Sequence, residues 1–213
     1  MSLRFENVGI ALGAKPLIRP FMLSIKAGEV VTLMGPSGCG KSSLLAYVAG
    51  DLEAPLTGAG RVVLNGVDLA DLRPEQRQVG RLFQDDLLFP HMTVGENLMF
   101  GVKRGQPRLE MMQTALARAG LEGFEDRSPQ TLSGGQRVRV SLMRALLAKP
   151  DAMLLDEPFN KLDKDLRATM RAYVFDHLLT RNIPCLMVTH DQDDVPNSGR
   201  VFRVATDGEV RHV

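Results

Sequence analysis

Eight consecutive residues, Gly35 to Ser42, follow the spacing G-x-x-x-x-G-K-S, which suits a chain of phosphates. In such a loop the backbone N–H groups point at phosphate oxygens, and the start of a following helix adds positive potential. Lys41 would reach the outer phosphates, and the Ser42 hydroxyl would bind Mg²⁺. The pattern predicts a nucleoside triphosphate site. The residues expected to bind the nucleotide here are Gly35, Pro36, Ser37, Gly38, Cys39, Gly40, Lys41, Ser42 and Ser43.

The segments on either side of this loop are those that a phosphate site requires. Residues 30–34 form a short run that is apolar and mostly β-branched, which is typical of a buried parallel strand. After the loop, Leu44 and Val48 stand at helical spacing and the pattern stops at Gly50. A glycine-rich turn without a ligand is the alternative, but the order strand, loop, helix favours phosphate binding.

Two carboxylates, Asp156 and Glu157, follow the apolar run at 153–155. Because the carboxyl ends of parallel strands line the ligand crevice of an α/β sheet, this pair should face the phosphates. We expect Asp156 to hold Mg²⁺ through water and Glu157 to act as general base on the attacking water. The alternative is that both merely cap a turn before Pro158.

A second glycine-rich segment, Leu132 to Gln136, opens a predicted helix that carries Val138 and Leu142. A loop of this kind at a helix N-terminus again suits a phosphate. One nucleotide does not need two such loops from one chain. The sequence therefore predicts a head-to-tail pair of chains that share two sites.

The composition limits the possible partners and compartments of the chain. Its 213 residues include 26 basic and 25 acidic side chains, so no overall field favours nucleic acid as a partner. No apolar run approaches the length of a membrane span, and the N-terminus lacks a signal-peptide pattern. Cys39 and Cys185 form neither a disulfide framework nor a metal-binding spacing. We expect a protein of the cytoplasm that reaches a membrane only through a partner.

The rest of the chain predicts strands first and helices later. Residues 2–34 favour strands, and a glycine turn at 58–60 is expected before a strand at 62–64 that closes at Asn65-Gly66. From about 93 to 148 the periodicity is helical. In that region the buried face of one helix is expected to hold Leu109, Met112, Leu116 and Ala119, with Gly120 ending it. A further apolar stripe is formed by Leu166, Met170, Tyr173, Val174, His177 and Leu178.

The phosphate loop, Gln84, the segment at 132–136, Asp156-Glu157, Asp163 and His190 follow one another in an order that is diagnostic of a family. From about residue 2 to 212 the chain resembles the ATP-binding subunit of an ABC transporter. The resemblance implies a P-loop NTPase core of α/β class with a parallel sheet, an N-terminal antiparallel β subdomain and an inserted α-helical subdomain. It implies one domain, 1–213, in which 1–84 and 150–213 form the core with the β subdomain and about 85–149 form the helical subdomain.

The resemblance also implies roles for individual residues. Gln84 would contact Mg²⁺ and the attacking water and would couple the site to a membrane subunit. Asp163 would organise the dimer seam, and His190 would contact the γ-phosphate beside Glu157. The signature segment would bind the ATP of the partner chain, chiefly through Ser133 and Gly135. The signature residues are Ser133, Gly134, Gly135 and Gln136.

The sequence departs from the family pattern at two places. The aromatic residue expected under the adenine falls near Leu12, so we expect weaker ATP affinity and poor discrimination against GTP. The stretch 160–163 reads N-K-x-D, which is also the guanine-reading element of GTPases. That alternative needs its own preceding strand, whereas Asp156-Glu157 stands immediately upstream. Lys161 replaces a usually small residue near the expected dimer seam.

Residues 85–97 are similar to the segment of importer-type subunits that receives a short helix of the membrane subunit. The apolar side chains of Leu87, Leu88, Phe89 and Met92 suit such a groove, although they could equally pack the helical subdomain. The implied partners are a second ATPase subunit, transmembrane permease subunits and a solute-binding protein, at the cytoplasmic face of the cell membrane. Export, and a soluble ABC-type switch in DNA repair or translation, are the alternatives.

Overall fold

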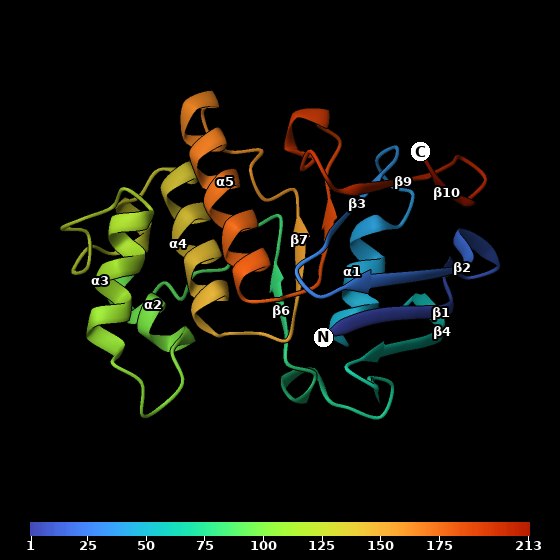
Figure 1. Ribbon diagram of the computed structural model, residues 1–213, viewed down its shortest axis with the longest axis horizontal. Coiled ribbons are helices and arrows are strands. Elements are labelled where there is room, and N and C mark those ends of the chain that lie inside the picture. The colour runs from blue at the N-terminus through green and yellow to red at the C-terminus, as the bar shows by residue number, and fades with distance from the viewer. The chain divides into compact units, whose positions relative to one another are not determined.

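The computed structural model describes all residues, 1–213, and the chain forms two compact units. Unit 1 comprises Met1–Arg81, Asp151–Glu157 and Phe175–Val213, and unit 2 comprises Leu82–Pro150 and Pro158–Val174. No helix has both the length and the apolar character that crossing a bilayer requires. Figure 1 labels the helices and strands that the following paragraphs describe.

The first sheet of unit 1 is antiparallel and has the order β2-β1-β4-β5. Its strands are β1 (Ser2–Leu12), β2 (Lys15–Lys26), β4 (Leu56–Leu64) and β5 (Val67–Asp68). The prediction of a turn at 58–60 is wrong. These residues belong to β4, whose pairing with β1 shifts register opposite Glu6–Gly9. Gly60 has φ 90°, and a Cβ there would lie 2.2 Å from the Asn7 carbonyl oxygen, so glycine marks a bulge and not a turn. The turn at Asn65-Gly66 is confirmed.

The second sheet of unit 1 has six strands in the order β10-β9-β3-β8-β7-β6. These are β3 (Val30–Met34), β6 (Val79–Leu82), β7 (Ala152–Asp156), β8 (Cys185–Val188), β9 (Arg200–Val204) and β10 (Val210–His212). β3 runs parallel to β8 and β9, and β7 runs parallel to β8. Every residue of β3, β7 and β8 is buried, which explains their uninterrupted apolar sequences. Leu33, Val188 and Asp156 lie in register, so the three strands end at one edge.

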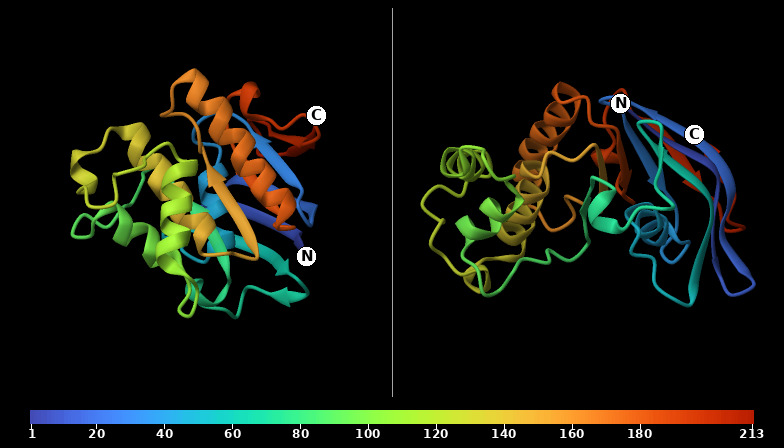
Figure 2. Two further views of the ribbon diagram at one scale, coloured as in Figure 1. Left: turned by 60° about the vertical axis from the view of Figure 1, so that its left-hand side comes forward. Right: turned by 90° about the horizontal axis from the view of Figure 1, so that it is seen from below.

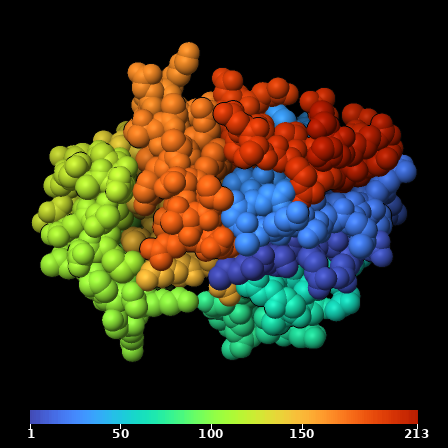
Figure 3. Space-filling view, viewed as in Figure 1, coloured from blue at the N-terminus to red at the C-terminus, as the bar shows by residue number.

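Helix α1 (Lys41–Ala49) lies between the two sheets of unit 1 and contacts β1 and β4 on one side and β7 and β8 on the other. In the right-hand view of Figure 2 the blue and teal strands curve over this helix. Leu44, Leu45 and Val48 are fully buried there and form one core with side chains of both sheets. The C-terminal strands lie beside the N-terminal ones (Figure 3), and the Arg19 N–H donates to the Gly208 carbonyl at 2.7 Å. The sequence places the phosphate loop at the start of this central helix.

Unit 2 contains α2 (Val94–Gly101), α3 (Arg108–Arg118), α4 (Gly134–Leu147) and the first part of α5 (Lys164–Thr180). In α3, Met112 and Leu116 are buried as expected, and Gly120 ends the helix with φ 60°. Leu109 was expected on the same face but is 61 % exposed, because the buried face of α3 begins one turn later at Met112.

The remaining short elements are 3₁₀ turns. They are η1 (Pro74–Gln76), η2 (Pro129–Thr131) and η3 (Gln192–Asp194). The last of them follows His190 and stops before Pro196, since proline cannot continue a helix beyond its first turn. In α5, Met170, Val174 and Leu178 are buried at helical spacing, as their pattern predicts.

Candidate nucleotide-binding site

The phosphate loop joins the carboxyl end of β3 to the first turn of α1, both in unit 1. Gly35, Gly38 and Gly40 have φ of 154°, 77° and 92°, a region that favours glycine. A Cβ at Gly40 would lie 2.9 Å from the Leu17 Cβ, and one at Gly35 would lie 2.9 Å from the Val204 carbonyl oxygen. No side chain caps the N–H groups of α1 at Gly40. These donors therefore face the loop, as a phosphate site requires.

Lys41 is 9 % exposed and its ammonium group lies along the loop. Its Nζ donates to the Gly35 carbonyl at 2.9 Å and to the Pro36 carbonyl at 2.8 Å. The Cys39 Sγ lies 3.7 Å from the same nitrogen. The cationic end of Lys41 is thus held inside the loop by backbone carbonyls, where a phosphate oxygen would meet it.

Asp156 ends β7 and its side chain is almost fully buried in unit 1. Burial raises the pKa of this carboxyl, while a hydrogen bond from the Ser42 hydroxyl and the nearby charges of Arg81 and Lys41 act in the opposite direction. The carboxylate and the hydroxyl are therefore neighbours. They present two hard oxygen atoms beside the loop.

Glu157 and His190 are brought together at the ends of two adjacent strands of unit 1. The His190 Nδ1 lies 2.8 Å from the Glu157 Oε1. The Glu157 N–H donates to the Val188 carbonyl at 2.9 Å, and its φ of 49° is unusual for a residue with a Cβ. Its side chain is 14 % exposed, against 70 % for His190. The carboxylate is fixed at the edge of the sheet and its histidine partner faces solvent.

Thr189 is a member of this group that the sequence did not single out. The residue is fully buried, and its hydroxyl lies 3.5 Å from the Glu157 Oε2 and 3.2 Å from the Asp194 Oδ2. The same hydroxyl accepts the Asp191 N–H at 3.1 Å. A polar residue directly after an apolar strand is the sequence signal that could have identified it.

Leu12 stands at the carboxyl end of β1 and is 43 % exposed. The aromatic residues nearest in sequence, Phe5 and Phe21, stack on each other with ring centroids 5.8 Å apart, and Phe5 belongs to the core. Neither ring therefore replaces the aromatic residue that the position of Leu12 lacks.

The signature segment begins α4 in unit 2, with Ser133 as its N-cap. The Ser133 Oγ accepts the Gln136 N–H at 3.3 Å, and the Gln136 Oε1 accepts the Ser133 N–H at 2.8 Å, which is a capping box. A Cβ at Gly135 would lie 3.0 Å from the Lys161 carbonyl oxygen, whereas one at Gly134 would lie 4.0 Å from the Arg137 Nη2. Ser133 is exposed. The second glycine segment thus opens a helix, as predicted, and presents its serine to solvent.

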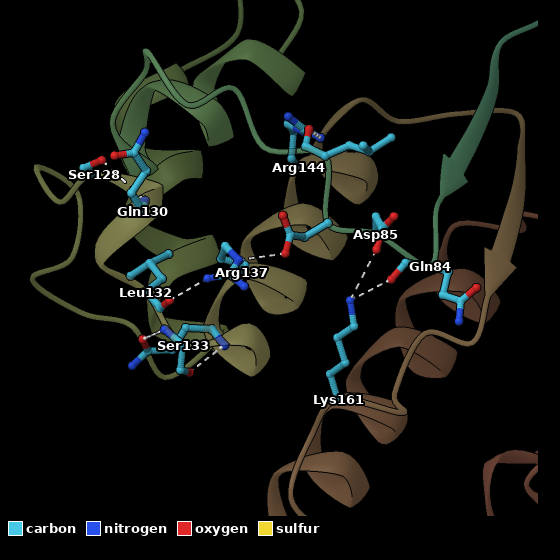
Figure 4. A network of polar contacts seen from close by, with 12 residues as sticks. Gln84, Asp85, Ser128, Gln130, Leu132, Ser133, Arg137, Arg144 and Lys161 are labelled. Carbon is cyan, nitrogen blue, oxygen red and sulfur yellow. Dashed lines mark hydrogen bonds and ion pairs between the residues drawn. The ribbon is translucent and has the colours of Figure 1, made fainter.

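Gln84 and the two residues after it lie close to basic side chains of unit 2 (Figure 4). The Lys161 Nζ donates to the Gln84 carbonyl at 3.1 Å and lies 3.7 Å from the Asp85 Oδ1. The Arg137 Nε donates to the Asp86 Oδ2 at 2.8 Å. Residues 158–163 form no strand, so the guanine-reading interpretation of the N-K-x-D stretch lacks the strand it needs. The ammonium group of Lys161 is thus held by residues of its own chain.

Asp163, the residue expected at the dimer seam, caps the start of α5 in unit 2. Its Oδ1 accepts the Leu166 N–H at 3.1 Å, and its carbonyl accepts the Arg167 N–H at 2.8 Å. The residue itself is exposed.

Asn97 organises the segment at 85–97, a role that the sequence reasoning missed. Its side chain is fully buried in α2 and its Oδ1 accepts the Phe89 N–H at 2.9 Å. Its Nδ2 lies 2.9 to 3.3 Å from the carbonyl oxygens of Phe89, Met92 and Thr93. The Arg144 guanidinium contacts the same Oδ1 at 3.2 Å. An asparagine one helical turn after the N-cap Thr93 of α2 was the only sequence signal.

This segment leaves apolar side chains on the surface of unit 2. Leu87 is 53 % exposed, and Phe89 packs edge-on, with centroids 4.7 Å apart, against Phe100, which lies beyond the segment in α2 and is 60 % exposed. Leu88 and Met92 are half-buried. The apolar residues of 85–97 are therefore divided between packing and exposure, and neither sequence interpretation covers all of them.

Comparison with known proteins supplies the family. The family model described as "ABC transporter" matches residues 18–160, and a protein of Escherichia coli K12, the "Uncharacterized ABC transporter ATP-binding protein YnjD", is 44 % identical over 203 residues, covering 94 % of each chain. The chain belongs to the ABC transporter family. It is an ATP-binding subunit of that family and an ABC ATPase.

Two further likenesses of this ABC ATPase bear on its fold and function. The "Fe(3+) ions import ATP-binding protein FbpC" of Photorhabdus laumondii subsp. laumondii is 42 % identical over 214 residues, which cover 94 % of this chain but 60 % of that relative. A solved dimer of the ATP-binding cassette MJ0796 in a post-hydrolysis state, bound to ADP and Pi, matches with a TM-score of 0.84 at 30 % identity, covering 99 % and 97 % of the two chains. The expected fold class is confirmed.

Proposed function

We propose that this chain energises import of a solute: two copies close around two ATP molecules, closure drives a membrane partner, and hydrolysis resets the pair. The observation that carries the hydrolytic part is the Glu157–His190 pair at the edge of the sheet where the phosphate loop begins. The direction rests on the likeness to the iron-import subunit, of which this chain spans about three-fifths. The membrane and solute-binding subunits would select the solute.

Phosphoryl transfer to water needs a positioned nucleophile and neutralised charge. Glu157, held through its N–H and by His190, would accept a proton from the attacking water. Lys41 would exchange its bonds to loop carbonyls for bonds to the outer phosphates. His190 would contact the γ-phosphate from its exposed position.

The residues beside the loop suit Mg²⁺. The Ser42 hydroxyl and the Asp156 carboxylate are adjacent oxygen ligands, and Asp156 is buried enough that a cation would relieve the cost of its charge. We propose that these two residues hold the ion together with the nucleotide, and that Gln84 joins them. When bound, the ion supplies neutralisation of the phosphate charge.

The second copy would complete each site through its signature segment. Ser133 is exposed, and the two glycines after it add no side chains at the amino end of α4, which favours an anion. We propose that Ser133 and Gly135 contact the γ-phosphate bound by the other chain, and that Asp163 lies at the seam. The solved dimeric cassette of similar fold supports this arrangement.

The membrane partner would dock on the segment at 85–97 at the cytoplasmic face. Leu87, Phe89 and Phe100 provide apolar surface that suits a short helix of a permease subunit. Co-purification with membranes is the expected result, and co-sedimentation with nucleic acid would instead support a soluble switch.

The test is Glu157→Gln at saturating ATP and Mg²⁺. The variant should lose turnover, because an amide cannot accept the proton, yet run as an ATP-dependent dimer on a sizing column. Glu122→Gln, an exposed change in unit 2, is the matched control and should retain turnover. A Glu157→Gln protein that stays monomeric with ATP contradicts the proposal.

A further inference from the structure

One arginine of unit 2 contacts both the segment after Gln84 and the signature segment. Arg137 lies in the first turns of α4, and its Nε donates to the Asp86 Oδ2 at 2.8 Å. Its Nη1 donates to the Leu132 carbonyl at 2.7 Å. Figure 4 shows the two contacts diverging from a single guanidinium. The Arg137 side chain is 35 % exposed and that of Asp86 is 19 % exposed.

The two ends of this bridge stand directly beside residues of the proposed mechanism. Leu132 is buried and precedes Ser133, whose own carbonyl accepts the Arg137 N–H at 3.0 Å. Arg137 thus binds two successive carbonyls of the signature turn, one through its side chain and one through its backbone. Asp86 comes two residues after Gln84.

The other basic side chains around this segment do not make the same connection. The Arg144 Nη2 donates to the Leu87 carbonyl at 2.9 Å, and its second contact is Asn97 of α2. Lys161 binds the Gln84 carbonyl from the turn before α5. Both hold the segment in place, whereas the contacts of Arg137 extend from the segment to the signature turn.

We propose that Arg137 is a positioning residue that couples the segment after Gln84 to the signature turn. A displacement of Asp86 moves the guanidinium, and the guanidinium carries the Leu132 carbonyl and therefore Ser133. The planar fork of arginine allows this because its N–H groups point in fixed, different directions. The proposal rests on the proposed function, in which Ser133 completes the site of the second copy.

The experiment measures ATP-dependent dimerisation by sedimentation in the Glu157→Gln background. Arg137→Met removes the contacts to Asp86 and to the Leu132 carbonyl, and Asp86→Asn weakens the ion pair. The double variant completes a double-mutant cycle. We expect each single change to weaken dimerisation about five-fold or more, the lower end of typical coupling between sites. The double variant should be no weaker than Arg137→Met, because the two residues act through one contact.

Two further readouts separate coupling from a merely structural role. The affinity of the dilute monomer for ATP should stay within about two-fold, since the side chain of Arg137 binds Asp86 and the Leu132 carbonyl, both in unit 2. Arg108→Met removes an exposed arginine whose Nη2 donates to the Met99 carbonyl at 2.6 Å, and it should leave dimerisation unchanged.

Additive effects in the double variant, or unchanged dimerisation in Arg137→Met, overturn the coupling while the parent still dimerises with ATP. If the Glu157→Gln parent itself does not dimerise, the proposed function fails and the coupling fails with it. Thermal unfolding of each variant confirms that all are folded at the temperature of the assay.

Discussion

Asn97→Ala tests how the segment at 85–97 is held in place. The wild-type amide offers two N–H groups to the carbonyls of Phe89, Met92 and Thr93, and its oxygen accepts from the Phe89 N–H and the Arg144 guanidinium. That is about four hydrogen bonds at about 1 kcal/mol each. Water entering the small space would recover part of this, so we expect a loss of about 2–4 kcal/mol.

Urea denaturation followed by circular dichroism measures this loss. With a slope of about 2 kcal/mol/M, the midpoint should fall by about 1–2 M. Amide hydrogen exchange of residues 89–97 should accelerate in the same variant, because the Phe89 N–H loses its acceptor. Gln113→Ala, an exposed change on α3, is the control and should stay within about 0.5 kcal/mol. An Asn97→Ala protein as stable as this control would refute the reasoning.

Three other predictions concern the nucleotide site. Leu12→Tyr should tighten ATP binding by about 5- to 150-fold, because stacking on the adenine contributes about 1–3 kcal/mol. Titration calorimetry that shows a strong preference for ATP over GTP already in the wild type would contradict this. In the folded protein a thiol reagent should modify Cys39 alone, because Cys185 is fully buried and burial raises the pKa of its thiol. Two modified thiols per native chain would contradict this prediction. Lys161→Met should lower ATP turnover several-fold with little change in ATP affinity, because the Gln84 carbonyl loses its donor, whereas an unchanged turnover would assign Lys161 no role there.

The parts of the fold that sequence spacing predicted are those decided locally. The phosphate loop needs glycine at fixed positions and a helix directly after it, so Gly40 and Lys41 could be placed from the sequence alone. The register of parallel strands then accounts for Asp156 and His190 at one edge.

What sequence reasoning missed depends on contacts between distant segments. Gly60 lies opposite a bulge in β1 that only the pairing of β1 with β4 reveals, and the exposure of Leu109 depends on where α3 starts to pack. Asn97 binds carbonyls four to eight residues before it and Arg137 binds one five residues before it, and carbonyls carry no residue signature. Periodicity cannot identify such contacts.

The account depends most on the proposal that each ATP is bound by two chains. A crystal structure of Glu157→Gln with ATP and Mg²⁺ tests it directly. We predict a closed dimer in which the Ser133 hydroxyl of one chain lies within hydrogen-bonding distance of the γ-phosphate on Lys41 of the other. A closed dimer with Ser133 remote from every triphosphate would contradict the mechanism.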